Sequence, residues 1–287
     1  MSTPAAALPV DFDAAAPPSG RAAVLRSFWG LMRLEWRRQL LTPRVLWPLL
    51  LAALPVGITA AMAWALVHFD VSPEDRQDVP IVFANLYHGL IVRVVLFFGA
   101  LALFLNLVRG EVEERTFHYL LLTPVRRPAI VLAKYLAAVG TGWLLFVGAT
   151  AASFAIVNIP TGIGHLATAQ GLSELGAYCG MTALGCVGYG AAFLLLGCLL
   201  RSPGYLVAVF FAWEWFEFLL PPLLKQLSVV HYIKVLTPFP IPEGPFALLA
   251  DPVPAWQAVL QVAVYAAIGV AVAAWVTRRT DLDYGKG

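Results

Sequence analysis

The sequence predicts an all-α polytopic membrane protein with six transmembrane helices. Of its 287 residues, 60% are hydrophobic and only 13% are charged, whereas a soluble domain has about 25% charged residues. The hydrophobic residues also gather in long runs. Each run is close to the roughly 20 residues that a helix needs to cross a bilayer. Composition and run length together therefore exclude a soluble globular domain.

Six apolar runs are long enough to span a membrane, and their approximate limits can be read from the sequence. We place them at residues 45–67, 89–108, 135–157, 175–200, 205–224 and 255–276. An even number of spans puts both termini on the same side of the membrane. Residues 21–287 then form one transmembrane domain. Residues 1–20, rich in Ala and Pro, are expected to be a disordered cytoplasmic leader.

The basic residues predict how the spans are oriented. Most of the 19 Lys and Arg residues fall on one side, in segments 21–44, 109–134 and 278–286 and at Arg201. Loops that carry an excess of Lys and Arg face the cytoplasm. We therefore expect a multi-pass protein of the cytoplasmic (inner) membrane with both termini in the cytoplasm.

The segment before the first span has a pattern of its own. At about 100° per residue, large apolar side chains share one face of a helix over residues 22–41, with arginines along its edge. The residues concerned are Phe28, Trp29, Arg33, Trp36 and Arg37. Such a helix is expected to lie in the cytoplasmic interface, with its arginine heads near lipid phosphates. The alternative is that these arginines only set the topology of the first span.

A charged segment at residues 110–127 separates the second and third apolar runs. It begins with three glutamates, continues through a short apolar patch and ends with Pro124 and a basic pair. Acidic side chains favour the N-terminus of a helix, and proline ends one, so the segment predicts one short helix in the cytoplasm. The alternative is a solvated loop whose charges only fix topology.

This loop and the six-span architecture resemble the ABC-2 type permeases, the membrane subunits of one class of ATP-driven transporters. Their loop often reads Glu-x-Glu-x-Gly-Thr, then Leu-Leu, then Pro-[Val/Ile]-x-Arg. Here it reads Glu111-Val-Glu113-Glu-Arg115-Thr116, Leu120-Leu121-Leu122 and Pro124-Val125-Arg126-Arg127. Lys134 fits the family's usual basic residue, whereas Arg115 stands in place of the common glycine.

The resemblance implies a coupling helix that docks into an ATP-binding subunit. Its contact residues would be Glu111, Glu113, Glu114, Arg115, Thr116, Phe117, Tyr119 and Leu120. It also implies two copies of that ATPase, which would carry ATP and Mg, and a second permease copy in a homodimer or heterodimer. The family consists mostly of exporters. The sequence has no Gly-x-x-x-x-Gly-Lys-[Ser/Thr] phosphate loop, so nucleotide binding is expected on the separate chain.

Two carboxylates interrupt the fifth apolar run. Glu214 and Glu217 are three residues apart and would share one face of a helix. An ionised carboxylate inside the bilayer costs about 2.5–3.5 kcal/mol, so both need a cavity, a partner or a proton. One interpretation makes them, with Arg93, part of the translocation path or its gate. The other makes them a structural contact between the second and fifth spans, with Arg93 as the partner.

Two further patterns concern packing. In the fourth span, Gly176-x-x-x-Gly180 is a small-residue pair of the kind that lets neighbouring helices approach. Between the fifth and sixth spans, short apolar stretches alternate with prolines, which exclude another full span. These stretches are expected to form re-entrant helices that dip back into the outer leaflet. The resemblance to ABC-2 permeases implies the same.

No pattern in the sequence indicates catalysis or metal binding. Cys179, Cys186 and Cys198 all fall in the fourth span without metal-binding or redox spacing, and no His-Glu-x-x-His motif occurs. We therefore predict a transport subunit rather than an enzyme, with no cofactor of its own and no nucleic-acid partner. The alternative is a non-transporting scaffold or assembly factor that recruits a cytoplasmic partner through the same loop.

Overall fold

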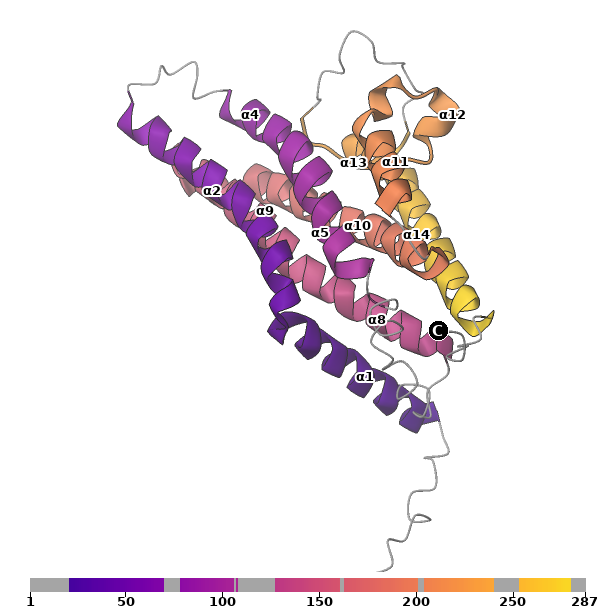
Figure 1. Ribbon diagram of the computed structural model, residues 1–287. Helices are drawn as coiled ribbons and strands as arrows, with labels where there is room; N and C mark the ends of the chain where they lie inside the picture. Colours follow the sequence, from indigo (N-terminus) through magenta and orange to yellow (C-terminus); the bar gives the residue numbers. More distant parts are fainter. Residues whose placement is uncertain are drawn as a thin grey trace, which may run out of the picture.

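The structure is a computed structural model, and it describes residues 21–69, 78–105, 107, 127–160, 163–200, 204–239 and 253–279. All regular secondary structure within these ranges is helical (Figure 1). Five of the described helical segments are long and apolar enough to cross a membrane. The predicted all-α, multi-pass membrane fold is therefore confirmed, whereas the six-span topology stays a prediction.

The first three candidate spans are each built from more than one helical element. Pro43–His68 joins η1 (Pro43–Val45) to α2 (Leu46–His68). Val79–Phe104 joins α4 (Val79–Leu86), the π-helical η2 (Tyr87–Leu96) and α5 (Phe97–Phe104). Pro128–Val157 joins α8 (Arg127–Gly142), the π-helical η3 (Trp143–Val147) and α9 (Gly148–Val157).

The other elements complete the bundle. The fourth span is α10 (Ala169–Leu199), which follows the short η4 (Ile163–Ala167), and the fifth is the Ala255–Thr277 part of α14 (Ala255–Arg279). Helix α1 (Arg21–Leu41) precedes the first span. Between α10 and α14 lie α11 (Gly204–Trp215), η5 (Glu217–Leu219), α12 (Pro222–Lys225) and α13 (Val229–Val235).

Three spans begin earlier than the sequence predicts, because polar residues near their starts have partners. The second begins at Val79 rather than near residue 89, and its His88 bonds Thr237 with Nε2 and Oγ1 2.9 Å apart. The third includes Lys134, whose Nζ lies 2.8 Å from Oε1 of Glu35. Similarly, the fourth includes the buried Glu174. A paired polar group costs less to bury than hydropathy alone suggests.

The predicted fifth span, 205–224, has a different form. Helix α11 ends at Trp215 after 12 residues, which is about 18 Å at 1.5 Å per residue and shorter than the roughly 30 Å hydrocarbon core. The chain then turns through η5, α12 and α13. Helices α12 and α13 lie in the region where re-entrant helices are expected. Whether they enter the outer leaflet stays a prediction.

Helix α10 forms the centre of the bundle, with α14, α5, α8 and α13 packed around it (Figure 1). Helix α2 packs on α9, and α1 packs on α8 at the opposite end of the bundle from α12 and α13. Aromatic rings fill much of the space around α10. Phe97 of α5 lies with its ring centroid 5.0 Å from that of Phe193 and 5.2 Å from that of Phe211. These contacts join α5, α10 and α11 in one core.

The close helix contacts of α10 lie further along the helix than the Gly176-x-x-x-Gly180 pattern predicts. Both of those glycines have open space where a Cβ would be. At Gly197, by contrast, a Cβ would clash with the backbone carbonyl of Leu105, just after α5. Backbone atoms cannot rotate away as a side chain can, so this contact requires glycine.

We expect Gly197→Ala to lower the stability of the protein by about 1–3 kcal/mol, the usual cost of overpacking a core. Gly180→Ala is the matched control in the same helix, and it should leave stability unchanged or raise it slightly through helix propensity. The measurement is the midpoint of thermal unfolding of the purified protein in detergent. Equal midpoints for the two variants would contradict the assigned contact.

Candidate functional site

The residues that the sequence predicts as functional fall into three groups, and the structure describes two of them. The third group is the proposed coupling segment. Its contact residues lie outside the described residues, and they are Glu111, Glu113, Glu114, Arg115, Thr116, Phe117, Tyr119 and Leu120. The described groups are the carboxylates near the end of α11 and the helix before the first span.

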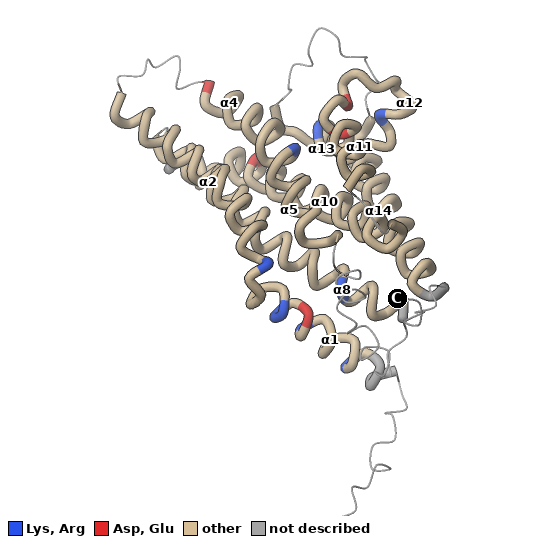
Figure 2. The backbone as a smooth tube through the Cα atoms, in the orientation of Figure 1, with Lys and Arg blue, Asp and Glu red and all other residues tan. Residues whose placement is uncertain are grey.

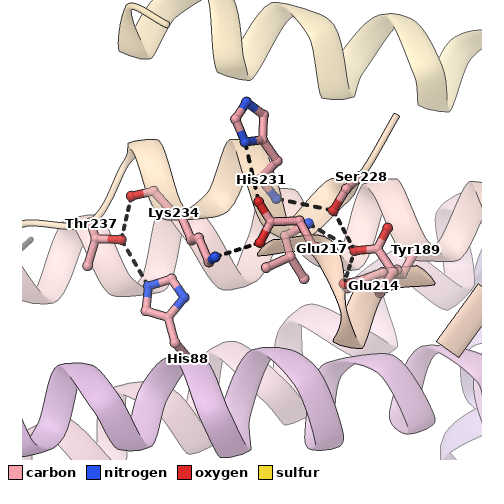
Figure 3. Close-up of polar contacts among 9 residues, drawn as sticks. His88, Tyr189, Glu214, Glu217, Ser228, His231, Lys234 and Thr237 are labelled. Carbon is pink, nitrogen blue, oxygen red and sulfur yellow. Dashed lines mark hydrogen bonds and ion pairs between the residues drawn. The ribbon is translucent and has the colours of Figure 1, made fainter. Parts of the chain in front are cut away.

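Glu214 lies near the end of α11, and its carboxylate is fully engaged with donors from two other helices (Figure 3). The Tyr189 hydroxyl of α10 donates to Oε2 at 3.0 Å, and the Ser228 hydroxyl donates to the same oxygen at 3.1 Å. The backbone amides of Val229 and Val230 donate to the carboxylate at 3.1 and 3.0 Å. Because these amides open the first turn of α13, the carboxylate caps that helix together with the N-cap residue Ser228.

Glu217 lies in η5, beyond the end of α11, and its partners are the basic side chains Lys234 and His231. Its Oε2 lies 2.5 Å from Nζ of Lys234, and its Oε1 lies 3.5 Å from Nδ1 of His231. Burial raises the pKa of the Glu217 carboxyl, but the contact with His231 and the positive charge of Lys234 outweigh burial and hold the pKa at about 2. Glu217 is therefore ionised at neutral pH.

The polar contacts continue from α13 to the second span. The Thr237 hydroxyl donates to the backbone carbonyl of Lys234 at 2.7 Å, and its oxygen lies 2.9 Å from Nε2 of His88 (Figure 3). The outer cluster, defined here as His88, Tyr189, Glu214, Glu217, Ser228, His231, Lys234 and Thr237, thus joins the second span, α10, α11 and α13. Within the described residues, no group of three or more His, Cys, Asp or Glu side chains is arranged to hold a metal ion.

Arg93 is not the partner of either carboxylate. Among the described residues, no ion pair joins it to Glu214 or Glu217, and its guanidinium instead lies 5.7 Å from the ring centroid of Trp215. The structural interpretation therefore needs different partners from those that the sequence suggested. Lys234 and Ser228 were missed because they lie 17 and 14 positions away from the carboxylates they contact. One signal in the sequence could have indicated the start of α13: Ser228 stands before an apolar stretch, and serine is a favoured N-cap residue.

The contacts within the outer cluster predict that replacing Glu214 and replacing Glu217 lower the stability of the protein by different amounts. We expect Glu214→Gln to lower stability by about 2–3 kcal/mol, because the amide NH2 would face a donor and charged hydrogen bonds would be lost. Glu217→Gln should cost about 1 kcal/mol less, since Lys234 can still donate to the amide oxygen. Thermal unfolding midpoints of the purified variants test this. A larger loss for Glu217→Gln than for Glu214→Gln would contradict the assigned roles.

Helix α1 confirms the predicted helix over residues 22–41, and it lies against the start of α8. Trp29, Trp36, Arg33 and Arg37 are exposed, while Phe28 is half-buried. The apolar face is therefore only partly covered by protein, as a membrane-facing surface would be. That this helix lies in the membrane interface stays a prediction.

A buried ion pair fixes α1 to α8, and the sequence pattern singles out only one of its members, Lys134. Glu35 is 3% exposed and Lys134 is 1% exposed, with Oε1 and Nζ 2.8 Å apart. Beside them, the Thr141 hydroxyl donates to Oε1 of Gln39 at 3.0 Å. The acidic Glu35 stands alone among the arginines of α1, and that isolation was the signal that could have indicated a partner.

Replacing one member of the Glu35–Lys134 pair should lower the stability of the protein. We expect Lys134→Met or Glu35→Leu to lower stability by about 3–5 kcal/mol, because each breaks a buried ion pair. The double variant Glu35→Leu/Lys134→Met should recover most of that loss. The measurement is a double-mutant cycle on thermal unfolding. Additive losses in the double variant would contradict the direct pairing.

Comparison with known proteins does not identify a family for this chain. Neither a scan against models of protein families nor a search of curated proteins gives a match for this chain. The resemblance to ABC-2 permeases therefore stays a prediction that rests on the residues of segment 110–134 and on the arrangement of apolar runs.

Proposed function

We propose that this chain is the membrane-spanning permease subunit of an ATP-driven transporter of the ABC-2 type, acting as an exporter. In this proposal, the cytoplasmic segment 110–127 docks on a separate ATP-binding subunit, of which the complex holds two copies. A second permease copy completes the pore. ATP and Mg belong to the ATPase, and this chain performs no chemistry of its own.

The observation that carries the proposal is how α8 is held at the end of the charged segment. Helix α8 begins at Arg127, the last residue of that segment, and Lys134 lies two turns further along. Lys134 is the residue that fits the family's basic position, and it forms the buried pair with Glu35 of α1. A displacement of the segment would therefore move α8 and α1 together as one stiff unit.

The distribution of charged residues supports the proposed position of segment 110–127 on the cytoplasmic side. The arginines of α1 and η1 gather at the end of the bundle where α5 ends and α8 begins (Figure 2). The outer cluster lies toward the opposite end, near α12 and α13 (Figure 2). Since Lys and Arg concentrate on the cytoplasmic side, the attachment points of segment 110–127 fall where a soluble ATPase would reach them.

The contacts of the outer cluster favour different roles for its two carboxylates. Glu214 is occupied by four donors from its own chain, so it holds α13 in place. Glu217 is ionised and pairs with Lys234, whose side chain is 18% exposed, and with His231. Glu217 is therefore the better candidate for a polar point on the translocation path, with Arg93 on the neighbouring span.

Affinity capture tests the proposal. The tagged full-length chain is captured from the membranes of its native host in mild detergent, and co-purified chains are identified by mass spectrometry. We expect a polypeptide with a phosphate loop and ATP hydrolysis by the captured complex. Glu113→Lys/Glu114→Lys should reduce its recovery about tenfold or more, because reversed charges at a docking surface repel the groups that they were selected to meet.

The matched control reverses two acids elsewhere on the same chain. Asp11→Lys/Asp13→Lys makes the same charge change in the leader and should leave ATPase recovery unchanged. Capture of no ATPase, or equal losses for the two double variants, would contradict the proposal. Capture of a partner without ATP hydrolysis, lost only in Glu113→Lys/Glu114→Lys, would favour a scaffold instead.

A further inference from the structure

An apolar groove lies between α1 and α8, which pack side by side (Figure 1). Its volume is about 540 Å³, within the roughly 300–1,000 Å³ that is usual for small-molecule sites. Large apolar side chains form its walls and small residues leave the space between them, and these residues are Trp29, Trp36, Leu136, Gly30, Ala137 and Gly140. The described lining includes neither member of the Glu35–Lys134 pair and no residue of the outer cluster.

The described part of the protein leaves this groove open. Trp29 is 57% exposed and Leu136 is 39% exposed. At Gly30, no described atom lies within 4 Å of the place that a Cβ would take, and at Gly140 the nearest is Nε1 of Trp36, at 3.8 Å. Apolar surface that is hollowed and uncovered in this way is typical of a site that another molecule fills.

The depth of the groove in the bilayer indicates what kind of molecule fills it. Leu136 and Gly140 belong to the third candidate span, which begins at Pro128. They lie roughly 12–18 Å beyond that start, at 1.5 Å per residue. The headgroup region takes up only about 5–8 Å on each side of a bilayer that is 40–45 Å thick in all. The α8 wall of the groove therefore lies at the depth of the acyl chains, which a water-soluble partner does not enter.

Two arginines of α1 lie at the edge of the groove. Arg33 lines the groove, and Arg33 and Arg37 both line an adjoining hollow of about 470 Å³. Both side chains are exposed, and no described residue forms an ion pair or a hydrogen bond with either of them. The one acidic residue of α1, Glu35, is instead buried against Lys134. Arginine stems can lie along apolar surface while their guanidinium groups bind two oxygens of a phosphate.

We propose that this groove binds one anionic membrane phospholipid, with an acyl chain between α1 and α8 and the headgroup phosphate on Arg33 and Arg37. The indole rings of Trp29 and Trp36 pack along the upper part of the chain, at the level where tryptophan is favoured in membranes. The lipid fills the space that the small residues leave and joins α1 to the third span. This site involves no ATPase and no transport step, so it stands or falls separately from the proposed function.

The first test fills the groove with a side chain. Gly30→Leu adds atoms where no described atom lies within 4 Å, so the fold has no clash to absorb. Native mass spectrometry of the purified full-length protein measures the fraction of chains that retain one phosphatidylglycerol as this lipid is titrated in detergent. We expect Gly30→Leu to weaken binding about 15-fold, the equivalent of two buried CH2 groups. Gly57→Leu, at an equally open glycine of α2, is the matched control and should bind like the unchanged protein.

The second test removes the headgroup contacts. We expect Arg33→Gln to weaken phosphatidylglycerol binding about fivefold and Arg33→Gln/Arg37→Gln about 25-fold, from the usual contribution of a basic side chain near an anionic surface. The matched control is Arg26→Gln, an exposed arginine of the same helix that lines neither hollow. It should bind as tightly as the unchanged protein. Glycerophosphoglycerol, which is the same headgroup without acyl chains, should not compete for the site.

Loss of lipid in Gly30→Leu and in the Arg33 variants, with both controls unchanged, supports the proposal. Loss in the arginine variants alone, or an equal loss in Arg26→Gln, indicates attraction to an anionic surface without a chain site and overturns it. Absence of retained lipid overturns it as well. A dimer that Gly30→Leu dissociates, with the lipid count unchanged, assigns the groove to a second copy of the chain and also overturns it. If Gly30→Leu does not fold, competition by glycerophosphoglycerol decides, and effective competition contradicts an acyl-chain site.

Discussion

Polar groups buried inside a membrane protein are stable only where another part of the chain supplies a partner, because the hydrocarbon core offers no water. The described part of this chain meets that constraint at both ends of the bundle. At one end, Lys134 is buried against Glu35. At the other, the Glu214 carboxylate is held by donors from α10 and α13. Each pairing joins helices that are distant in sequence.

The two pairings have different mechanical consequences. The Glu35–Lys134 pair holds two long helices, α1 and α8, side by side. The Glu214 contacts instead hold a short helix, α13, against α10, and five residues of α13 are buried. A helix of this length is marginal alone, and its position depends on the cap that α11 supplies.

Much of the fold could be predicted from composition and periodicity. The apolar runs predicted the five candidate spans that the structure describes, and the aromatic and arginine pattern predicted a helix before the first span. The predicted limits of the spans were less accurate near polar residues that pair with another helix or segment, as at His88 and Lys134. Hydropathy treats such a residue as if it had no partner. The sequence suggested Arg93 as a partner because the depth of a residue in the membrane can be estimated from its position in an apolar run. The rotation of each helix about its own axis, which decides which side chains meet, cannot be estimated in that way.

The sequence by itself determined that this is an all-α membrane protein, that residues 110–127 form a charged interruption, and that Glu214 and Glu217 would be costly to bury. These are properties of single residues and of short-range spacing. Only the tertiary structure decided which groups meet. It ended α11 at Trp215, paired Glu217 with Lys234 and His231, and buried Lys134 against Glu35. Contacts of this kind depend on how helices rotate and pack against one another, which no local pattern specifies.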